Sequence, residues 1–322
     1  MKSNHYTMVA RNAIKKALSH VNDSENIGVG CSGGADSTAI MLGLSTLYKG
    51  NKAKNVHVII INHQLQEITD QISLNTAELA QSYGFNAHIV PVTIDSNDGG
   101  MESAARNARY GAFEEMIEKY ELKAFLIGHT KNDQAEQVFL GMLRGSGTKS
   151  LSGIPETRGI FVRPFLNTVS RKDTQKVCEE NGVDYWCDPH NDSLMYKRVS
   201  VRKLIKATEE STGQDIVDSL VRTSQISSED AEALDFYADV AVAELDNVGW
   251  SSVSLMKFPK AVRKRAYRAK LASMGAKSDS LSFNVVSAID DLVVNWHGQG
   301  AVSVTNMIYV RRSGIRMVFD IK

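Results

Sequence analysis

The chain has 322 residues, of which 43% are hydrophobic and 23% are charged, and its formal net charge is zero. That length and composition favour two domains with a sizeable hydrophobic core and argue against a disordered chain. The zero net charge argues, on its own, against a nucleic-acid partner, and the lack of any run of about 18 uncharged apolar residues argues against a membrane span.

The cysteines and the N-terminal segment bear on where the protein works. The cysteines are Cys31, Cys178 and Cys187, and an odd number without C-x-x-C spacing argues against a disulfide framework and a zinc ribbon. The first segment, MKSNHYTMVARNAIKKALSH, has the pattern of an amphipathic helix and lacks the apolar stretch of a secretory signal. We therefore expect a cytoplasmic protein.

The first half of the chain alternates short apolar runs with helical patterns. The apolar runs, rich in β-branched residues, predict strands at 27–31, 56–61, 87–92 and 124–127. The intervening patterns predict helices at 36–48, about 68–83 and 102–120, and a further strand at 161–164 precedes a helix at about 170–181. This alternation predicts βαβ units, and therefore an α/β fold with a doubly wound parallel sheet.

The pattern changes near residue 210, which predicts one domain over 1–210 and a second over 211–322. The second domain should be smaller and mostly helical, with helices at about 214–247, from Pro259 onward and at about 281–295. Its last residues, AVSVT, MIYVRR and IRMVF, alternate as strands do, and Ser313-Gly314 supplies a turn.

Charge is distributed unevenly along the second domain. Residues 207–246 contain eleven acidic residues and one basic residue, whereas 257–270 contain seven basic residues and no acidic one. A local basic patch can steer a polyanion even in a neutral chain. We therefore predict that Lys260, Arg263, Lys264 and Arg268 contact a phosphate backbone. The alternative is an ordinary amphipathic helix with a soluble face.

The stretch GVGCSGGADSTA, residues 28–39, joins the first predicted strand to the first predicted helix. A glycine turn at the carboxyl end of a parallel strand lets backbone N–H groups and the helix N-terminus approach an anion. Asp36 would repel a bare phosphate, so it fits best if it holds a magnesium ion that bridges phosphates. The alternative is a tight turn in which Asp36 caps the helix.

Four motifs resemble those of a known family. SGGADS resembles the pyrophosphate-binding loop (PP-loop) of the N-type ATP pyrophosphatases, whose fold is of the adenine nucleotide alpha hydrolase type. ESAARNARYGAF (102–113), IGHTKNDQAEQVFLGMLRGSG (127–147) and DPHNDSLMYKRVSVRKLI (188–205) resemble, in order and spacing, three blocks of the tRNA(Ile)-lysidine synthases. The last 110 or so residues resemble that family's connecting helical domain more weakly. The resemblance therefore implies a member without the further C-terminal domain that longer members carry.

The resemblance implies an ATP-dependent ligase with Mg²⁺ as cofactor. ATP would adenylate the carbonyl oxygen at carbon-2 of the wobble cytidine in an isoleucine tRNA with a CAU anticodon. The ε-amine of free L-lysine would then displace AMP and leave lysidine. Adenylation turns a poor leaving group into a good one, and a carboxylate base can keep the amine neutral.

The resemblance also assigns roles to individual residues. ATP would be bound by the glycine loop, the end of the fourth strand and one arginine, namely Cys31, Ser32, Gly33, Gly34, Ala35, Asp36, Ser37, Gly128, His129 and Arg106. Catalysis would involve Asp36, with its Mg²⁺, and Arg106, His129, Asp133 and Glu136. The tRNA or lysine would meet Arg144, Arg198 and Arg202, besides the basic helix.

Each of these residue types also has a purely structural interpretation. His129 could be a strand-end histidine bonded to a carbonyl, and Asp133 and Glu136 could complete a first helical turn capped by Asn132 or Asp133. Arg106 could form an i,i+4 salt bridge with Glu102 worth only about 0.3–0.5 kcal/mol. Arg198 and Arg202 could form a solvated basic face.

The chain departs from the family pattern at several positions. Asn132 stands where the family has the first of two aspartates, which leaves Asp133 as the stronger candidate. Asn62, Gln64 and Gln66 replace Asp, Gly and Arg of a D-H-G-L-R motif. His190 replaces a serine, and Val199 an asparagine.

Two rival functions remain open at this point. A tRNA thiolase would use the same activation but normally needs paired cysteines, which the lack of C-x-x-C opposes. A nucleotide-sensing or RNA-binding relative without turnover is the other rival, because of the departures from the family pattern. The oligomeric state is not fixed by the sequence, and a homodimer is one arrangement to be tested.

Overall fold

The computed structural model describes residues 4–62, 67–93, 101–187 and 197–322 and divides the chain into two compact units, Met1–Gln225 and Ile226–Lys322. The division falls inside helix α9 (Ile216–Val248), whereas the change in sequence pattern placed it near residue 210. The start of α9 belongs to the first unit because Leu220 is buried in a cluster with Val138 and Ile205. Packing therefore continues past the point where composition changes.

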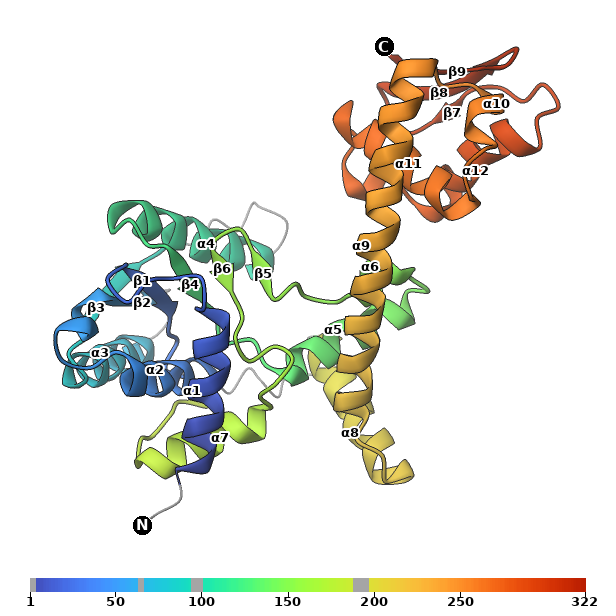
Figure 1. Cartoon of the computed structure of the whole chain (residues 1–322). Helices are drawn as coiled ribbons and strands as arrows, with labels where there is room; N and C mark the ends of the chain where they lie inside the picture. Colours follow the sequence, from blue (N-terminus) through green and yellow to red (C-terminus); the bar gives the residue numbers. More distant parts are fainter. Residues whose placement is uncertain (1–3, 63–66, 94–100, 188–196) are drawn as a thin grey trace. The chain divides into compact units, whose positions relative to one another are not determined.

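The first unit contains a six-stranded sheet in the order β3–β2–β1–β4–β6–β5 (Figure 1). Its strands are β1 (Ile27–Gly30), β2 (Val56–Asn62), β3 (Asn86–Pro91), β4 (Ala124–Leu126), β5 (Thr157–Arg158) and β6 (Phe161–Val162). All neighbours are parallel except β5 and β6, which form an antiparallel edge pair. The parallel sheet predicted from the βαβ pattern is confirmed.

Helices cover both faces of this sheet. The helices of the first unit are α1 (His5–Ala17), α2 (Ala35–Leu47), α3 (Glu67–Ser82), α4 (Met101–Lys119), α5 (Lys131–Leu143), α6 (Thr148–Leu151), α7 (Arg171–Asn181) and α8 (Lys197–Thr212), with a 3₁₀ turn at Gly50–Asn55. Of these, α5 and α8 pack with the start of α9 in a cluster of their own. Successive strand residues point to opposite faces. Leu126 packs in the core that contains α1, α2 and α7, whereas its neighbour Phe125 packs with Phe113 and Met116 of α4.

The strand order creates a switch point between β1 and β4. The chain leaves β1 through α2 and reaches β2 on one side of β1, and it enters β4 from α4 on the other side. The carboxyl ends of β1 and β4 therefore lie side by side with diverging connections, and ligands of open α/β sheets bind at such points. The glycine loop follows β1, and Gly128-His129 follows β4.

The second unit is a helical cluster that ends in a small sheet. It holds most of α9, then α10 (Ser252–Leu255), α11 (Lys260–Ser273), a 3₁₀ turn (Ser278–Ser280), α12 (Phe283–Val294) and strands β7 (Val302–Ser303), β8 (Ile308–Ser313) and β9 (Arg316–Ile321). The strands form an antiparallel sheet in chain order. Leu255, Tyr267, Ile289 and Val310 are fully buried in its core. In the part of the chain that the structure describes, no helix has the length and apolarity needed to span a membrane.

Candidate active site

The loop between β1 and α2 has a backbone shape that only glycine adopts readily. Gly33 has φ of +79°, and a Cβ there would come within 2.8 Å of Ile72 and 2.9 Å of the Thr76 hydroxyl. Its carbonyl oxygen accepts a hydrogen bond from the N–H of Trp186 at 2.9 Å. The loop is therefore held from two sides, by α3 and by the segment that follows α7.

The N-terminus of α2 is open toward an anion. Its N-cap is Gly34, and among the described residues no side chain caps it, so N–H groups of its first turn keep their capacity to bind phosphate oxygens. The Ser37 hydroxyl accepts the N–H of Ser32 at 3.2 Å and donates to the carbonyl of Gly34 at 3.1 Å. Ser37 thus shapes the loop from inside, and the buried Cys31 thiol lies 3.5 Å from the same hydroxyl. Ala35 begins the helix.

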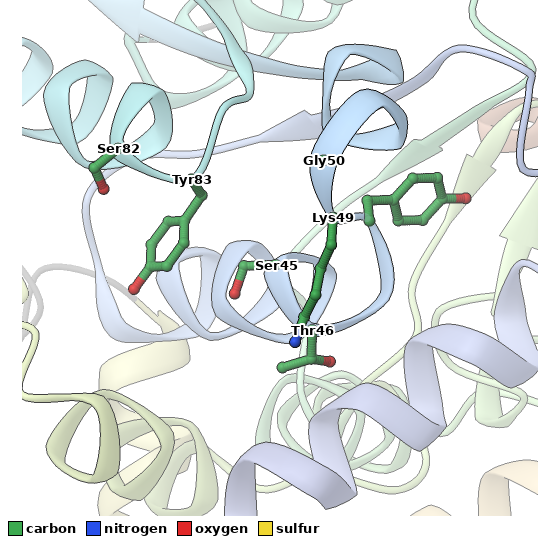
Figure 2. A pocket seen from close by; sticks show the side chains of 7 residues that line it. Ser45, Thr46, Lys49, Gly50, Ser82 and Tyr83 are labelled. Atoms are coloured by element: carbon green, nitrogen blue, oxygen red, sulfur yellow. The ribbon is translucent and has the colours of Figure 1, made fainter.

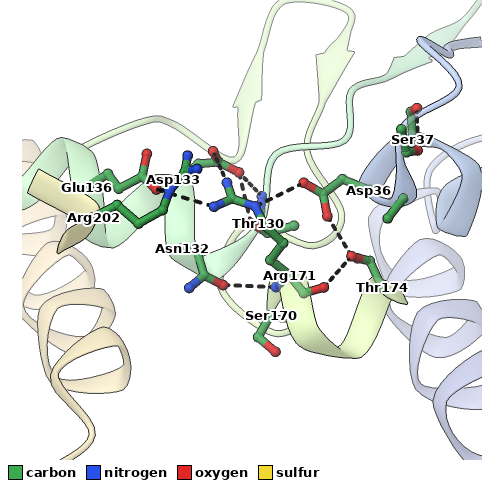
Figure 3. A network of polar contacts seen from close by, with 12 residues as sticks. Asp36, Ser37, Thr130, Asn132, Asp133, Glu136, Ser170, Arg171, Thr174 and Arg202 are labelled. Atoms are coloured by element: carbon green, nitrogen blue, oxygen red, sulfur yellow. Dashed lines mark hydrogen bonds and ion pairs between the residues drawn. The ribbon is translucent and has the colours of Figure 1, made fainter. Parts of the chain in front are cut away.

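Asp36 lies in the first turn of α2 and faces a cation from α7. One carboxylate oxygen accepts from the Thr174 hydroxyl at 2.5 Å, and the other lies 3.5 Å from Nε of Arg171 (Figure 3). Burial raises the pKa of Asp36 to about 6, although the charge of Arg171 opposes the shift. Asp36 is therefore not the helix cap, and its ionised form needs more positive charge than Arg171 supplies.

The end of β4 packs directly against the phosphate loop. A Cβ on Gly128 would lie 3.0 Å from the backbone nitrogen of Ser37, so this approach requires glycine. His129 follows, and its Nδ1 accepts a hydrogen bond from Nε of Arg163 at 3.2 Å. Burial lowers the pKa of His129 to about 4, so the ring is neutral at pH 7 and carries its proton on Nε2.

Arg171 connects the carboxylates of two helices. Its guanidinium lies 3.0 Å from Asp133 and 3.4 Å from Glu136, both on α5, besides its contact with Asp36 (Figure 3). Asp133 also accepts from the N–H and the hydroxyl of Thr130, each at 2.8 Å. Burial would raise the pKa of Asp133, but Arg171, His129 and the Thr130 bonds outweigh it and lower the pKa. Asp133 therefore caps α5 and binds a cation at the same time.

Glu136 completes the cluster through a second arginine. Nε of Arg202, on α8, donates to Glu136 at 2.8 Å, and the Glu136 side chain is only 3% exposed. The cluster then holds the three carboxylates of Asp36, Asp133 and Glu136 against the two guanidinium groups of Arg171 and Arg202. With His129 neutral, ionisation of all three acids leaves a charge of about −1, which favours one more cation beside an anion-binding helix.

Comparison with known proteins identifies the family to which this chain belongs. A family model described as a PP-loop domain matches residues 6–208. A tRNA(Ile)-lysidine synthase of Salinispora tropica is 37% identical over 96% of this chain and 95% of its own length. Another, of Streptomyces coelicolor, is 36% identical over 90% of this chain and 84% of its own length. The chain belongs to the tRNA(Ile)-lysidine synthase family. The resemblance seen in the sequence motifs is confirmed.

A solved structure has a fold similar to that of this chain. The U34-tRNA thiolase NcsA from Methanococcus maripaludis, solved with its 4Fe-4S cluster, superposes with a TM-score of 0.57 at 17% identity and covers 69% of this chain and 80% of the thiolase chain. At that identity the likeness supports the PP-loop fold and no particular reaction.

Arg171 is the site residue that sequence reasoning missed in this family member. It is separated by 35 residues from Glu136 and by 38 from Asp133, so only the fold brings them together. A signal was nevertheless present in the sequence, because α7 begins with Arg171 and Lys172. Cations are disfavoured at the positive end of a helix, so two of them there indicate an external partner.

Three further arginines that the sequence predicted for the site are exposed. Arg106 is exposed on α4, with its guanidinium 5.0 Å from the centre of the Tyr110 ring. Arg198 is exposed at the start of α8, and Arg144 is exposed at the end of α5. The side chain of Glu102 lies outside the described residues, so its predicted pair with Arg106 is not addressed.

The prediction for the basic helix α11 was wrong at Arg263. Arg263 was predicted to contact phosphate, but it is buried and binds Asp290 through Nε at 2.9 Å and Nη2 at 3.1 Å. Arg265 and Lys270 of the same helix pair with Asp235 and Asp246. The acidic segment therefore supplies carboxylates to the basic helix.

The other predicted residues of α11 have fewer intramolecular contacts than Arg263. Lys260 is exposed, and Lys264 lies 4.8 Å from the centre of the Phe283 ring and donates to the Ser287 hydroxyl at 2.8 Å. Arg268 is half-buried and donates to the carbonyl of Leu281 at 2.5 Å. Of the four predicted phosphate contacts, Lys260 and Lys264 are the ones that the structure leaves suited to the role.

Two departures from the family pattern have local explanations. Asn132 accepts the backbone N–H of Arg171 at 2.9 Å, and so helps to fix the arginine. Asn62 donates to Asp70 at 2.5 Å, a bond that an ionised aspartate at 62 could not make. Val199 is buried on α8. Gln64, Gln66 and His190 lie outside the described residues.

A pocket of about 390 Å³ near the C-terminal end of α2 does not extend the site (Figure 2). Ser45, Thr46 and Lys49 are among its lining residues. The hydroxyls of Ser45 and Thr46 donate to carbonyls of their own helix, at 2.8 Å and 2.7 Å. These polar groups are thus used within the helix.

Asp36 is the carboxylate of this site that suits a magnesium ion. Among the described residues no group of three or more His, Cys, Asp or Glu side chains is arranged to hold a metal ion. Magnesium, however, typically takes one or two carboxylates together with substrate phosphates and water. Asp36 fits that role, because a buried carboxylate lies beside an uncapped helix N-terminus and keeps a raised pKa.

Proposed function

We propose that this chain forms lysidine on an isoleucine tRNA with a CAU anticodon, using ATP and free L-lysine. In the first step the carbonyl oxygen at carbon-2 of the wobble cytosine attacks the α-phosphorus of ATP and pyrophosphate leaves. In the second, the ε-amine of lysine attacks carbon-2, the bond from carbon-2 to the oxygen breaks, and AMP leaves with that oxygen.

One observation carries this proposal. An open helix N-terminus lies next to a carboxylate cluster with an excess of negative charge, within a chain of the lysidine synthase family. The helix suits the phosphates of ATP, and the cluster suits a cation. ATP and a cationic amine are the two small substrates that the reaction requires.

We assign each site residue the role that its surroundings suit. The N–H groups at the start of α2 would bind the leaving pyrophosphate and stabilise the charge that develops on it. His129, neutral and with its proton on Nε2, can donate to a phosphate oxygen. Asp133 and Glu136 would hold the lysine ammonium and accept the proton that it must lose before attack.

The remaining assignments belong to the same proposal. Magnesium, held by Asp36, would neutralise charge on the phosphates. Arg202 would neutralise part of the charge on Glu136. Arg144 and Arg198, with Lys260 and Lys264 of the second unit, would contact RNA. We add Arg106 to these RNA contacts, although the motif resemblance assigned it to ATP binding and catalysis. A cytoplasmic location follows from a tRNA substrate, and a homodimer stays a prediction that light scattering can test.

Labelled lysine provides the direct test. The protein is incubated with ATP, magnesium and total bacterial tRNA, and each tRNA is then examined for covalent label. Label on the isoleucine tRNA alone, with one AMP and one pyrophosphate per lysine, is expected. Pyrophosphate release without lysine incorporation, or label in none of the tRNAs, would contradict the proposal and favour a relative without this activity.

A tRNA thiolase is the less favoured candidate. The sequence has no C-x-x-C motif, and Cys31 and Cys178 are both buried. Burial raises the pKa of Cys178 to about 12, so its thiol is a poor nucleophile and a poor metal ligand at neutral pH.

A further inference from the structure

A groove of about 590 Å³ lies in the first unit between α4 and the β5–β6 edge. Its α4 wall carries Arg106, Tyr110, Glu114 and Glu118, which are four residues apart and therefore form one stripe along the helix. The volume lies in the range of pockets that bind small ligands. None of the roles assigned above uses the groove as a binding site.

The groove is lined by charges of both signs. Arg106 and Arg158 are both exposed in its lining, Arg158 opposite Phe161 in the β5–β6 pair, and the guanidinium of Arg158 makes no hydrogen bond or ion pair with any described residue. Glu114 and Glu118 lie one and two further turns along α4 from Tyr110. An anion is therefore favoured near the arginines and a hydrogen-bond donor near the glutamates.

Two aromatic rings also line the groove. Tyr110 and Phe161 meet edge to face, with ring centres 5.3 Å apart and an interplanar angle of 68°. Arg106 already rests on the Tyr110 ring at 5.0 Å, which shows that this ring accepts a flat cationic group. Base–aromatic stacking contributes about 1–3 kcal/mol per base in single-stranded complexes.

The groove also adjoins the candidate active site. Arg163 lines it and donates through Nε to His129 at 3.2 Å, at the end of β4. Arg163 is itself fixed by a bond to the carbonyl of Pro155 at 2.9 Å. A ligand in the groove would therefore be separated from the end of β4 by one buried arginine.

We propose that the groove binds a nucleotide of the RNA substrate next to the target base, with its phosphate at Arg106 and Arg158 and its base against Tyr110. An exocyclic amino group of that base would be accepted by Glu114, as carboxylates accept from cytosine amino groups. The inference rests on the proposed function, because it assigns the groove to the same tRNA. It gives single-stranded RNA a path that leads to the end of β4.

Arg158→Gln tests the proposal in the full chain, with Arg222→Gln as a matched control. Both arginines are exposed on the first unit, but only Arg158 lines the groove. The probe is a fluorescent anticodon stem-loop of the isoleucine tRNA, and its anisotropy is measured without ATP or lysine over a range of salt concentrations. Arg158→Gln should weaken binding about three- to tenfold and reduce the salt slope by about one.

The remaining measurements separate the alternatives. Arg158→Glu should weaken RNA binding further than Arg158→Gln, while ATP affinity stays unchanged in both. Equal RNA affinity of Arg158→Gln and Arg222→Gln would overturn the proposal, as would a raised KM for lysine with unchanged RNA affinity, which would indicate an amino-acid pocket. Because binding is measured without turnover, a wild-type chain that binds RNA through the groove but forms no lysidine would contradict the proposed function and leave this inference standing.

Discussion

Two arginine–carboxylate clusters, one in each unit, differ in their balance of charge. In the second unit Arg263 and Asp290 form a one-to-one pair, and their side chains are only 8% and 2% exposed. In the first unit Arg171 faces Asp36, Asp133 and Glu136, with Arg202 as the second cation. The Arg171 side chain keeps 26% exposure.

The difference separates a structural pair from a binding site. Asp290 satisfies both oxygens on Arg263 and accepts a further bond from the Tyr267 hydroxyl at 3.2 Å. Asp36, in contrast, keeps a pKa of about 6 because burial outweighs the positive charge it receives. A balanced buried pair leaves no charge for a ligand and is costly to break, whereas carboxylates in excess can bind a cationic ligand.

Breaking the balanced pair should have the largest effect. Asp290→Ala leaves the Arg263 charge buried without a partner, so we expect the free energy of unfolding to fall by roughly 3–5 kcal/mol. Urea denaturation followed by circular dichroism measures it. Asp320→Ala, which breaks the exposed pair with Arg311, is the control and should cost about 1 kcal/mol at most. Equal losses in the two variants would show that Asp290 is not structurally special.

Asp36→Asn should reduce activity by about two to three orders of magnitude and leave the chain folded. The reason is the loss of a charge beside the phosphates, where electrostatic contributions to catalysis are of that size. Pyrophosphate release with tRNA and limiting magnesium measures it. Activity close to wild type would remove Asp36 from the metal role.

The same variant has a predictable pH dependence of stability. Because the pKa of Asp36 rises from 3.8 to about 6 on folding, its neutral form favours the folded state. That stabilisation is fully present below pH 3.8 and is lost as the pH rises through about 6. Asp36→Asn should therefore gain stability relative to wild type over this interval. A constant difference would mean that Asp36 is well compensated in the fold.

Asp133→Asn should cost about a hundredfold in lysine transfer, within the range for general bases. Asn132→Asp should cost little, since an aspartate can still accept the backbone N–H of Arg171. Single-turnover transfer from preformed adenylated tRNA isolates this step. If both variants stayed close to wild type, Asp133 would serve only to cap α5.

Substitutions on α11 should have the smallest effects. Lys260→Gln and Lys264→Gln should each weaken tRNA binding about threefold and reduce the salt slope by about one, without changing ATP affinity. Arg263→Gln on the same helix should lower stability instead, because its guanidinium is buried on Asp290. Lysine variants with a wild-type salt slope would exclude α11 from RNA contact.

Local sequence patterns predicted most helices and strands. The full set of site residues could be identified only from the three-dimensional fold. The strands and helices of the first unit follow from apolar periodicity, which neighbouring residues determine. Asp36, Asp133 and Glu136 were found because they adjoin glycine or strand-end signals. Arg171 was missed because its partners are distant in sequence, and Arg263 was misjudged because its carboxylate, Asp290, lies in another helix.

The hydrogen bond from Trp186 to the carbonyl of Gly33 gives the phosphate loop a built-in optical reporter. The chain has three tryptophans, and the other two, Trp250 and Trp296, belong to the second unit. We expect a change in the loop on nucleotide binding to alter the emission of Trp186, which adjoins Cys187, an exposed thiol suited to a second dye. Fluorescence of the natural sequence is then a way to follow occupancy of the loop before any substitution is introduced.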